Sequence, residues 1–74
     1  MKIQKIIAEN GPVQQLCKGG GCPAAIIAAD GNAYVQGYDL AEAERENLDA
    51  PAGESFVRIP LATLKKIAAQ VTNL

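Results

Sequence analysis

The sequence predicts a small α+β domain: an antiparallel sheet of four to five strands with a C-terminal helix packed on one face. Two observations support this fold class. In the first half of the chain, short β-branched and alanine-rich runs alternate with turns that contain glycine and asparagine, which is typical of hairpins. Near the C-terminus, apolar residues recur every three or four positions, which is typical of an amphipathic helix. We expect a single domain over residues 1–74.

The N-terminal segment predicts a first hairpin, with strands at about 2–8 and 13–17. Its isoleucines are β-branched and favour extended backbone. Asn10 and Gly11 both tolerate the positive φ that a type I′ turn needs. Pro12 follows at the edge of this turn, where its missing N–H does least harm.

A second hairpin is the clearest element of the sequence, with strands at about 24–29 and 33–38. Residues 24–29 are a continuous run of alanine and isoleucine, which is typical of a buried strand. Asp30-Gly31-Asn32 has turn chemistry, because aspartate and asparagine bond the local backbone and glycine accepts positive φ.

The middle of the chain predicts a short helix at about 40–47 and a fifth strand at about 55–59. Asp39 and Glu42 have the spacing of a capping box, with an acceptor at the N-cap and a glutamate at the third helical position. Proline and glycine within 50–53 then break the chain before the strand.

The last element is a helix at about 60–72, opened by Pro60. Its apolar residues lie on one stripe, which we expect to face the sheet. The stripe consists of Leu61, Leu64, Ile67 or Ala68, Val71 and Leu74.

The composition indicates a thin core and therefore a dimer. The chain has 74 residues, of which 49% are hydrophobic but only 4% aromatic, so the area that it buries per residue is small. Association with a second copy would add buried surface. We expect a homodimer for this reason.

Charge excludes several classes of protein. The net charge is −1, but residues 39–54 carry six carboxylates against Arg45, a net −5. A nearly neutral chain without a basic stripe is a poor nucleic-acid binder.

No apolar run is long enough to cross a bilayer, so we expect no membrane association. Lysines interrupt what would be the apolar core of a signal peptide, so we expect a cytoplasmic protein.

The chain has no histidine, and so lacks the commonest general base and the commonest metal ligand. We therefore expect no catalytic residues and no enzymatic activity. The acidic segment has two interpretations. It is either a solvated helix surface or a contact for a basic surface of a protein partner. In the second case the binding residues are Asp39, Glu42, Glu46 and Asp49.

Cys17 and Cys22 flank a loop with three consecutive glycines. Three interpretations remain open: two reduced thiols with a structural role, a redox disulfide, or half of a metal site. Zn²⁺ takes four ligands, so two cysteines would suffice only if a dimer shared the ion. Apart from this alternative, we expect no cofactor.

Three strings carry a resemblance to a known family: Cys22-Pro-Ala-Ala-Ile-Ile, Val35-Gln-Gly-Tyr38 and Gly53-Glu-Ser-Phe-Val-Arg-Ile-Pro60. In order and content, residues 17–70 resemble small bacterial regulatory accessory proteins of the DUF397 (BldB-like) kind. That family carries tryptophans near the N-terminus and in the final helix, whereas this chain has none. The resemblance implies a small dimeric partner of a helix-turn-helix transcriptional regulator, and it implies no catalytic residue.

The sequence thus favours a non-enzymatic interaction protein: a regulatory accessory homodimer that binds a protein partner. The alternative is a small metal- or thiol-binding module built on Cys17 and Cys22.

Overall fold

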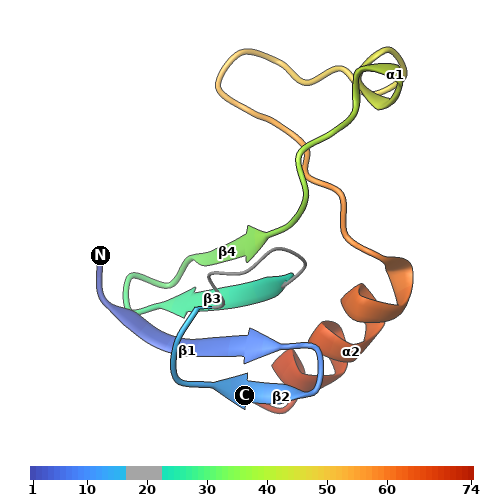
Figure 1. The fold of residues 1–74 in the computed structure, drawn as a ribbon. Coiled ribbons are helices and arrows are strands. Elements are labelled where there is room, and N and C mark those ends of the chain that lie inside the picture. Colours follow the sequence, from blue (N-terminus) through green and yellow to red (C-terminus); the bar gives the residue numbers. More distant parts are fainter. Residues whose placement is uncertain (17–22) are drawn as a thin grey trace.

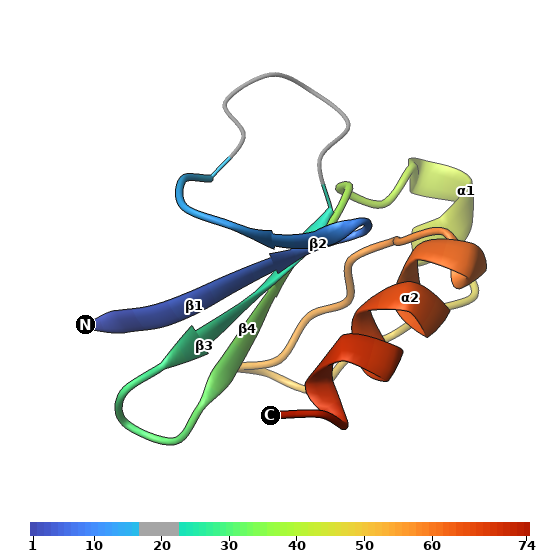
Figure 2. The ribbon, with the colours of Figure 1, turned by 90° about the horizontal axis from the view of Figure 1, so that it is seen from below.

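The α+β class is confirmed by a computed structural model, which describes residues 1–16 and 23–74. Its centre is a four-stranded antiparallel sheet in the order β2-β1-β3-β4, with one helix, α2, on one side (Figures 1 and 2). The elements are β1 (Ile3–Ala8), β2 (Gly11–Val13), β3 (Ala24–Ala28), β4 (Ala33–Gln36), α1 (Glu42–Arg45) and α2 (Leu61–Val71).

The first hairpin is present, but its turn lies one residue earlier than expected. Ala8 pairs with Gly11, so Glu9 and Asn10 are the turn residues and β2 begins at Gly11. Gly11 has a φ of 136°, and among the described residues only glycines have positive φ. The predicted type I′ turn at Asn10-Gly11 is therefore wrong, because Asn10 does not adopt the left-handed region that this turn requires. The predicted second strand at 13–17 is also misplaced, since β2 ends at Val13.

The second hairpin is confirmed. β3 pairs with β4 from Ala24↔Gln36 to Ile27↔Ala33. The turn is closed in the expected way, since Asn32 donates its backbone N–H to Asp30 Oδ1 at 2.9 Å. Gly31 has a φ of 88°, a backbone conformation that residues with a side chain rarely adopt.

The core forms where β1 and β3 lie side by side in the middle of the sheet. Ile7 pairs with Ala25, and both contact Ile67 of α2. Ile27 and Ile59 pack around this cluster. Ile7 is only 1% exposed. The side chain of Ala25, which pairs with it, is small and lets the helix approach the sheet closely.

α2 packs on the sheet as expected, but not with the expected stripe. Thr63 and Ile67 are its buried residues, whereas Leu61 is 66% exposed. Contacts at one flank set this rotation, because Gln70 Nε2 donates to the Ala8 carbonyl at 2.8 Å. Lys66 on the same flank donates to Glu9 at 3.0 Å. The helix is thereby held over the β1–β2 half of the sheet, and much of its apolar stripe faces outward.

The chain between β4 and α2 forms a projecting arm, residues 37–58, with α1 at its far end (Figure 1). The predicted fifth strand at 55–59 is wrong. This segment makes only an isolated bridge, Tyr38↔Arg58, and does not join the sheet. The predicted helix at 40–47 is shorter than expected and covers Glu42–Arg45. The fifth strand does not form because the arm leaves the sheet after β4, so residues 55–59 find no partner beyond Tyr38. The helix is shorter because it starts after Ala41 instead of after Asp39.

None of the helices in the described ranges is both long and apolar enough to span a bilayer.

Candidate functional site

The base of the arm is closed by two residues that meet across it. Tyr38 donates its N–H to the Arg58 carbonyl at 2.8 Å, and Arg58 returns a bond to the Tyr38 carbonyl at 2.9 Å. Beside this pair, a Cβ on Gly37 would lie 2.8 Å from the Arg58 carbonyl oxygen. Only glycine therefore allows these two segments of the chain to approach this closely.

The Arg58 side chain extends this closure towards α1. Its guanidinium lies 5.3 Å from the centroid of the Tyr38 ring, within the range of a cation–π interaction. Nη1 is 3.7 Å from Glu44 Oε2. Arg58 thus contacts Tyr38 across the base of the arm and Glu44 in α1.

The N-terminus of α1 is capped, but not by the predicted pair. The N-cap is Ala41, and its N–H donates to Glu44 Oε1 at 2.8 Å. Asp39 and Glu42 do not form the predicted capping box, because the helix begins two residues later than that box requires. Glu44 therefore serves both the helix cap and Arg58.

Between the two limbs of the arm lies a groove of about 320 Å³, lined by both apolar and charged side chains. Its walls come from the residues just after β4, from the end of α1 and from the segment that returns to α2. Phe56 is 48% exposed, and Leu48 and Val57 are similarly open to solvent. The lining residues are Asp39, Leu40, Arg45, Leu48, Ala50, Glu54, Ser55, Phe56 and Val57.

Of the four predicted partner-binding carboxylates, the structure brings one to this groove. Asp39 lines it, as does Glu54 from the returning limb. Glu42, Glu46 and Asp49 lie on the exposed surface of the same arm. The sequence pattern did not indicate Glu54 or the apolar residues as part of the site. Phe56 and Val57 belong to the predicted fifth strand, and only their position beside the acidic segment signals another role.

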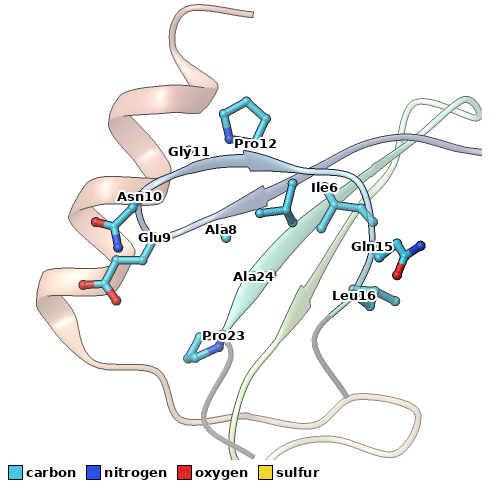
Figure 3. A pocket seen from close by; sticks show the side chains of 11 residues that line it. Ile6, Ala8, Glu9, Asn10, Gly11, Pro12, Gln15, Leu16, Pro23 and Ala24 are labelled. Carbon is cyan, nitrogen blue, oxygen red and sulfur yellow. The ribbon is translucent and has the colours of Figure 1, made fainter. Parts of the chain in front are cut away.

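A second hollow, of about 370 Å³, lies by the β1–β2 hairpin (Figure 3). Figure 3 shows Glu9 and Asn10 at the hairpin turn, with Leu16 and Pro23 on other parts of the wall. The lining is largely apolar. Its one carboxylate, Glu9, already accepts the hydrogen bond from Lys66.

Cys17 and Cys22, the predicted metal or disulfide residues, lie outside the described residues. Within residues 1–16 and 23–74, no three potential metal-ligand side chains come together.

Comparisons of the chain with protein-family models, with curated proteins and with solved structures return no match.

Proposed function

We propose that this chain is a non-enzymatic, regulatory accessory protein that acts as a homodimer and binds a protein partner through the groove of its arm. The observation that carries the proposal is the exposure of Leu48 in the acidic segment 39–54 and of Phe56 just after that segment. Large apolar side chains that line a hollow and are rimmed by charge are typical of a recognition surface.

The chemistry of the groove favours a basic, amphipathic partner segment. The apolar lining would receive two or three apolar side chains of such a segment. At the groove, the carboxylates of Asp39 and Glu54 outnumber the one cation, Arg45. With Glu42, Glu46 and Asp49 on the surrounding surface, they would attract lysines or arginines of the partner. The family resemblance implies a helix-turn-helix transcriptional regulator as the partner. A basic patch on the surface of such a regulator would have this chemistry.

The arm is suited to binding because its base is closed before the partner arrives. The backbone bonds between Tyr38 and Arg58 close its base, and Glu44 ties α1 to Arg58. A surface ordered in advance loses less conformational entropy on association.

Affinity capture with matched variants tests the proposal. Tagged wild-type protein and the variants Phe56→Ser and Val13→Ser would be incubated with lysate of the source cells, and retained proteins identified by mass spectrometry. Val13 is a suitable control because it is equally exposed, at 42%, but lies on β2 away from the arm. We expect a basic protein to be retained by the wild type and by Val13→Ser and lost with Phe56→Ser.

Two further measurements make the result specific. Cross-links between the purified partner and this chain should fall within residues 39–57. Raising the salt concentration from 50 to 300 mM should weaken binding severalfold, because the rim charges are exposed and screened. Equal retention of the partner by Phe56→Ser, or cross-links confined to the sheet, would contradict the proposal. So would turnover of a substrate that depends on the arm carboxylates.

A further inference from the structure

We propose that two copies of this chain associate through the outer edge of β4, together with the apolar flank of α2 that faces away from the β1–β2 hairpin. This inference rests on the homodimer of the proposed function and names its surface. The flank consists of Leu64 and Val71, and with Val35 and Val57 it forms what we call the open patch.

β4 is the least covered strand of the sheet. It lies at the edge of the strand order, and all four of its residues are exposed. Among the described residues, no strand pairs with its outer side. Its sequence, Ala33-Tyr34-Val35-Gln36, has no charge and no proline. Edge strands of monomeric proteins often carry charged residues or proline, which prevent pairing with another chain. β4 carries neither.

The position of α2 explains why the helix leaves β4 exposed. Lys66 and Gln70 bind Glu9 and Ala8 and turn one flank of the helix towards the β1–β2 hairpin. Residues of an α-helix are spaced by 100°, so Leu64 and Val71 lie on the opposite flank, beyond Ile67. Leu64 is 49% exposed.

The open patch continues from the helix to β4. Val35 lies on the α2 side of the sheet, because its pairing partner Ala25 contacts Ile67 there. It is nevertheless 51% exposed, since the helix does not reach β4. Val57 extends the patch: its Cγ2 would lie 3.0 Å from a Cβ on Gly37, which shares the face of Val35.

The chain exposes enough surface to accommodate such an interface. A compact protein of 7.7 kDa exposes about 4,300 Å². This chain exposes 5649 Å². A standard interface removes about 800 Å² from each partner. The excess is therefore larger than the area that each partner would lose.

The charge distribution indicates that the occupant is a second copy rather than the basic partner. A two-fold interface brings each residue close to its own counterpart, so like charges near the axis repel. The arm carries a net −5 within residues 39–54 and would repel itself, whereas β4 is uncharged. Antiparallel pairing of the two β4 strands would continue the sheet across the dimer and bring the two helix flanks closer together.

Sedimentation equilibrium of the full chain, from 1 to 200 µM, tests the inference. Four proteins are compared: wild type, Val35→Lys, Leu64→Lys and the control Val13→Lys. We expect the wild type and Val13→Lys to reach twice the monomer mass of 7.7 kDa. We expect Val35→Lys and Leu64→Lys to raise the dimer dissociation constant at least tenfold. Far-UV circular dichroism would establish that each variant is folded.

Hydrogen exchange of the wild type provides a second readout that needs no variant. Those amides of residues 33–36 that point away from β3 should become more protected as the concentration rises, while the amides of β2 should not. A wild-type monomer at every concentration would overturn the inference. So would a dimer that Val13→Lys dissociates and Val35→Lys does not. Phe56→Ser should remain dimeric, so loss of partner binding and loss of the dimer are separable.

Discussion

Tyr38 and Arg58 are joined both through the backbone and through their side chains. Their main chains exchange hydrogen bonds of 2.8 and 2.9 Å, while the Arg58 guanidinium lies 5.3 Å from the Tyr38 ring centroid. Nineteen residues lie between the two positions, so this contact converts the intervening segment into a closed arm. The groove proposed to bind a partner exists because of this closure.

Gly37→Ala should open the base of the arm. The added Cβ would lie 2.8 Å from the Arg58 carbonyl oxygen, a distance at which the backbone must move. We expect the free energy of unfolding to fall by about 1–3 kcal/mol, measured by urea denaturation. Amide exchange at Tyr38 and Arg58 should accelerate as well.

The control for this variant is Ser55→Ala, an exposed change on the same limb of the arm. It should change stability by less than about 0.5 kcal/mol. Wild-type stability of Gly37→Ala would show that the two limbs are not held as closely as described.

Arg58→Ala should cost less than the backbone change. The side chain is 55% exposed and its distance to Glu44 is 3.7 Å, so the ion pair is weak. The contact with Tyr38 supplies most of the effect, and we expect a loss of about 0.5–1 kcal/mol in thermal unfolding. Glu44→Gln, which keeps the Tyr38 contact, should cost less than Arg58→Ala; the reverse order would contradict this assignment.

Gln70→Ala should loosen α2 from the sheet. Gln70 Nε2 donates to the carbonyls of Ala8 at 2.8 Å and Glu9 at 3.3 Å, from a half-buried position. Removing the donor takes a hydrogen bond from each of these carbonyls, so we expect a loss of about 1–2 kcal/mol in chemical denaturation.

Gln70→Glu should be worse than Gln70→Ala, because a carboxylate would face carbonyl oxygens. The control is Asn73→Ala, since Asn73 Nδ2 bonds only the Ala69 carbonyl of its own helix at 3.1 Å. If all three variants had the same stability, the Gln70 bonds would not determine how α2 is seated.

Ile67→Ala should be the most damaging change in α2. Ile67 is the helix residue that contacts Ile7 and Ala25 in the small core. Truncation of a buried isoleucine costs about 2–4 kcal/mol, which is a large share of the stability of a chain this short. Leu74→Ala, at an exposed C-terminal position, should cost less than about 0.5 kcal/mol in the same denaturation series.

The sequence by itself determined the fold class, the second hairpin and the existence of α2. Each depends on local chemistry: the turn at Asp30-Gly31-Asn32, and the apolar spacing that begins after Pro60. It also determined where the acidic segment lies. These features could be predicted because they need no information about distant residues.

The tertiary structure alone decided the rest. Periodicity gave α2 an apolar stripe, but bonds from Lys66 and Gln70 to the β1–β2 hairpin turned that stripe partly outward. Residues 55–59 have the composition of a strand, yet only Arg58 finds a partner, in Tyr38. The groove and the open patch both result from such long-range contacts. They could not be predicted because a local pattern shows which residues favour burial, but not which of them meet a neighbour.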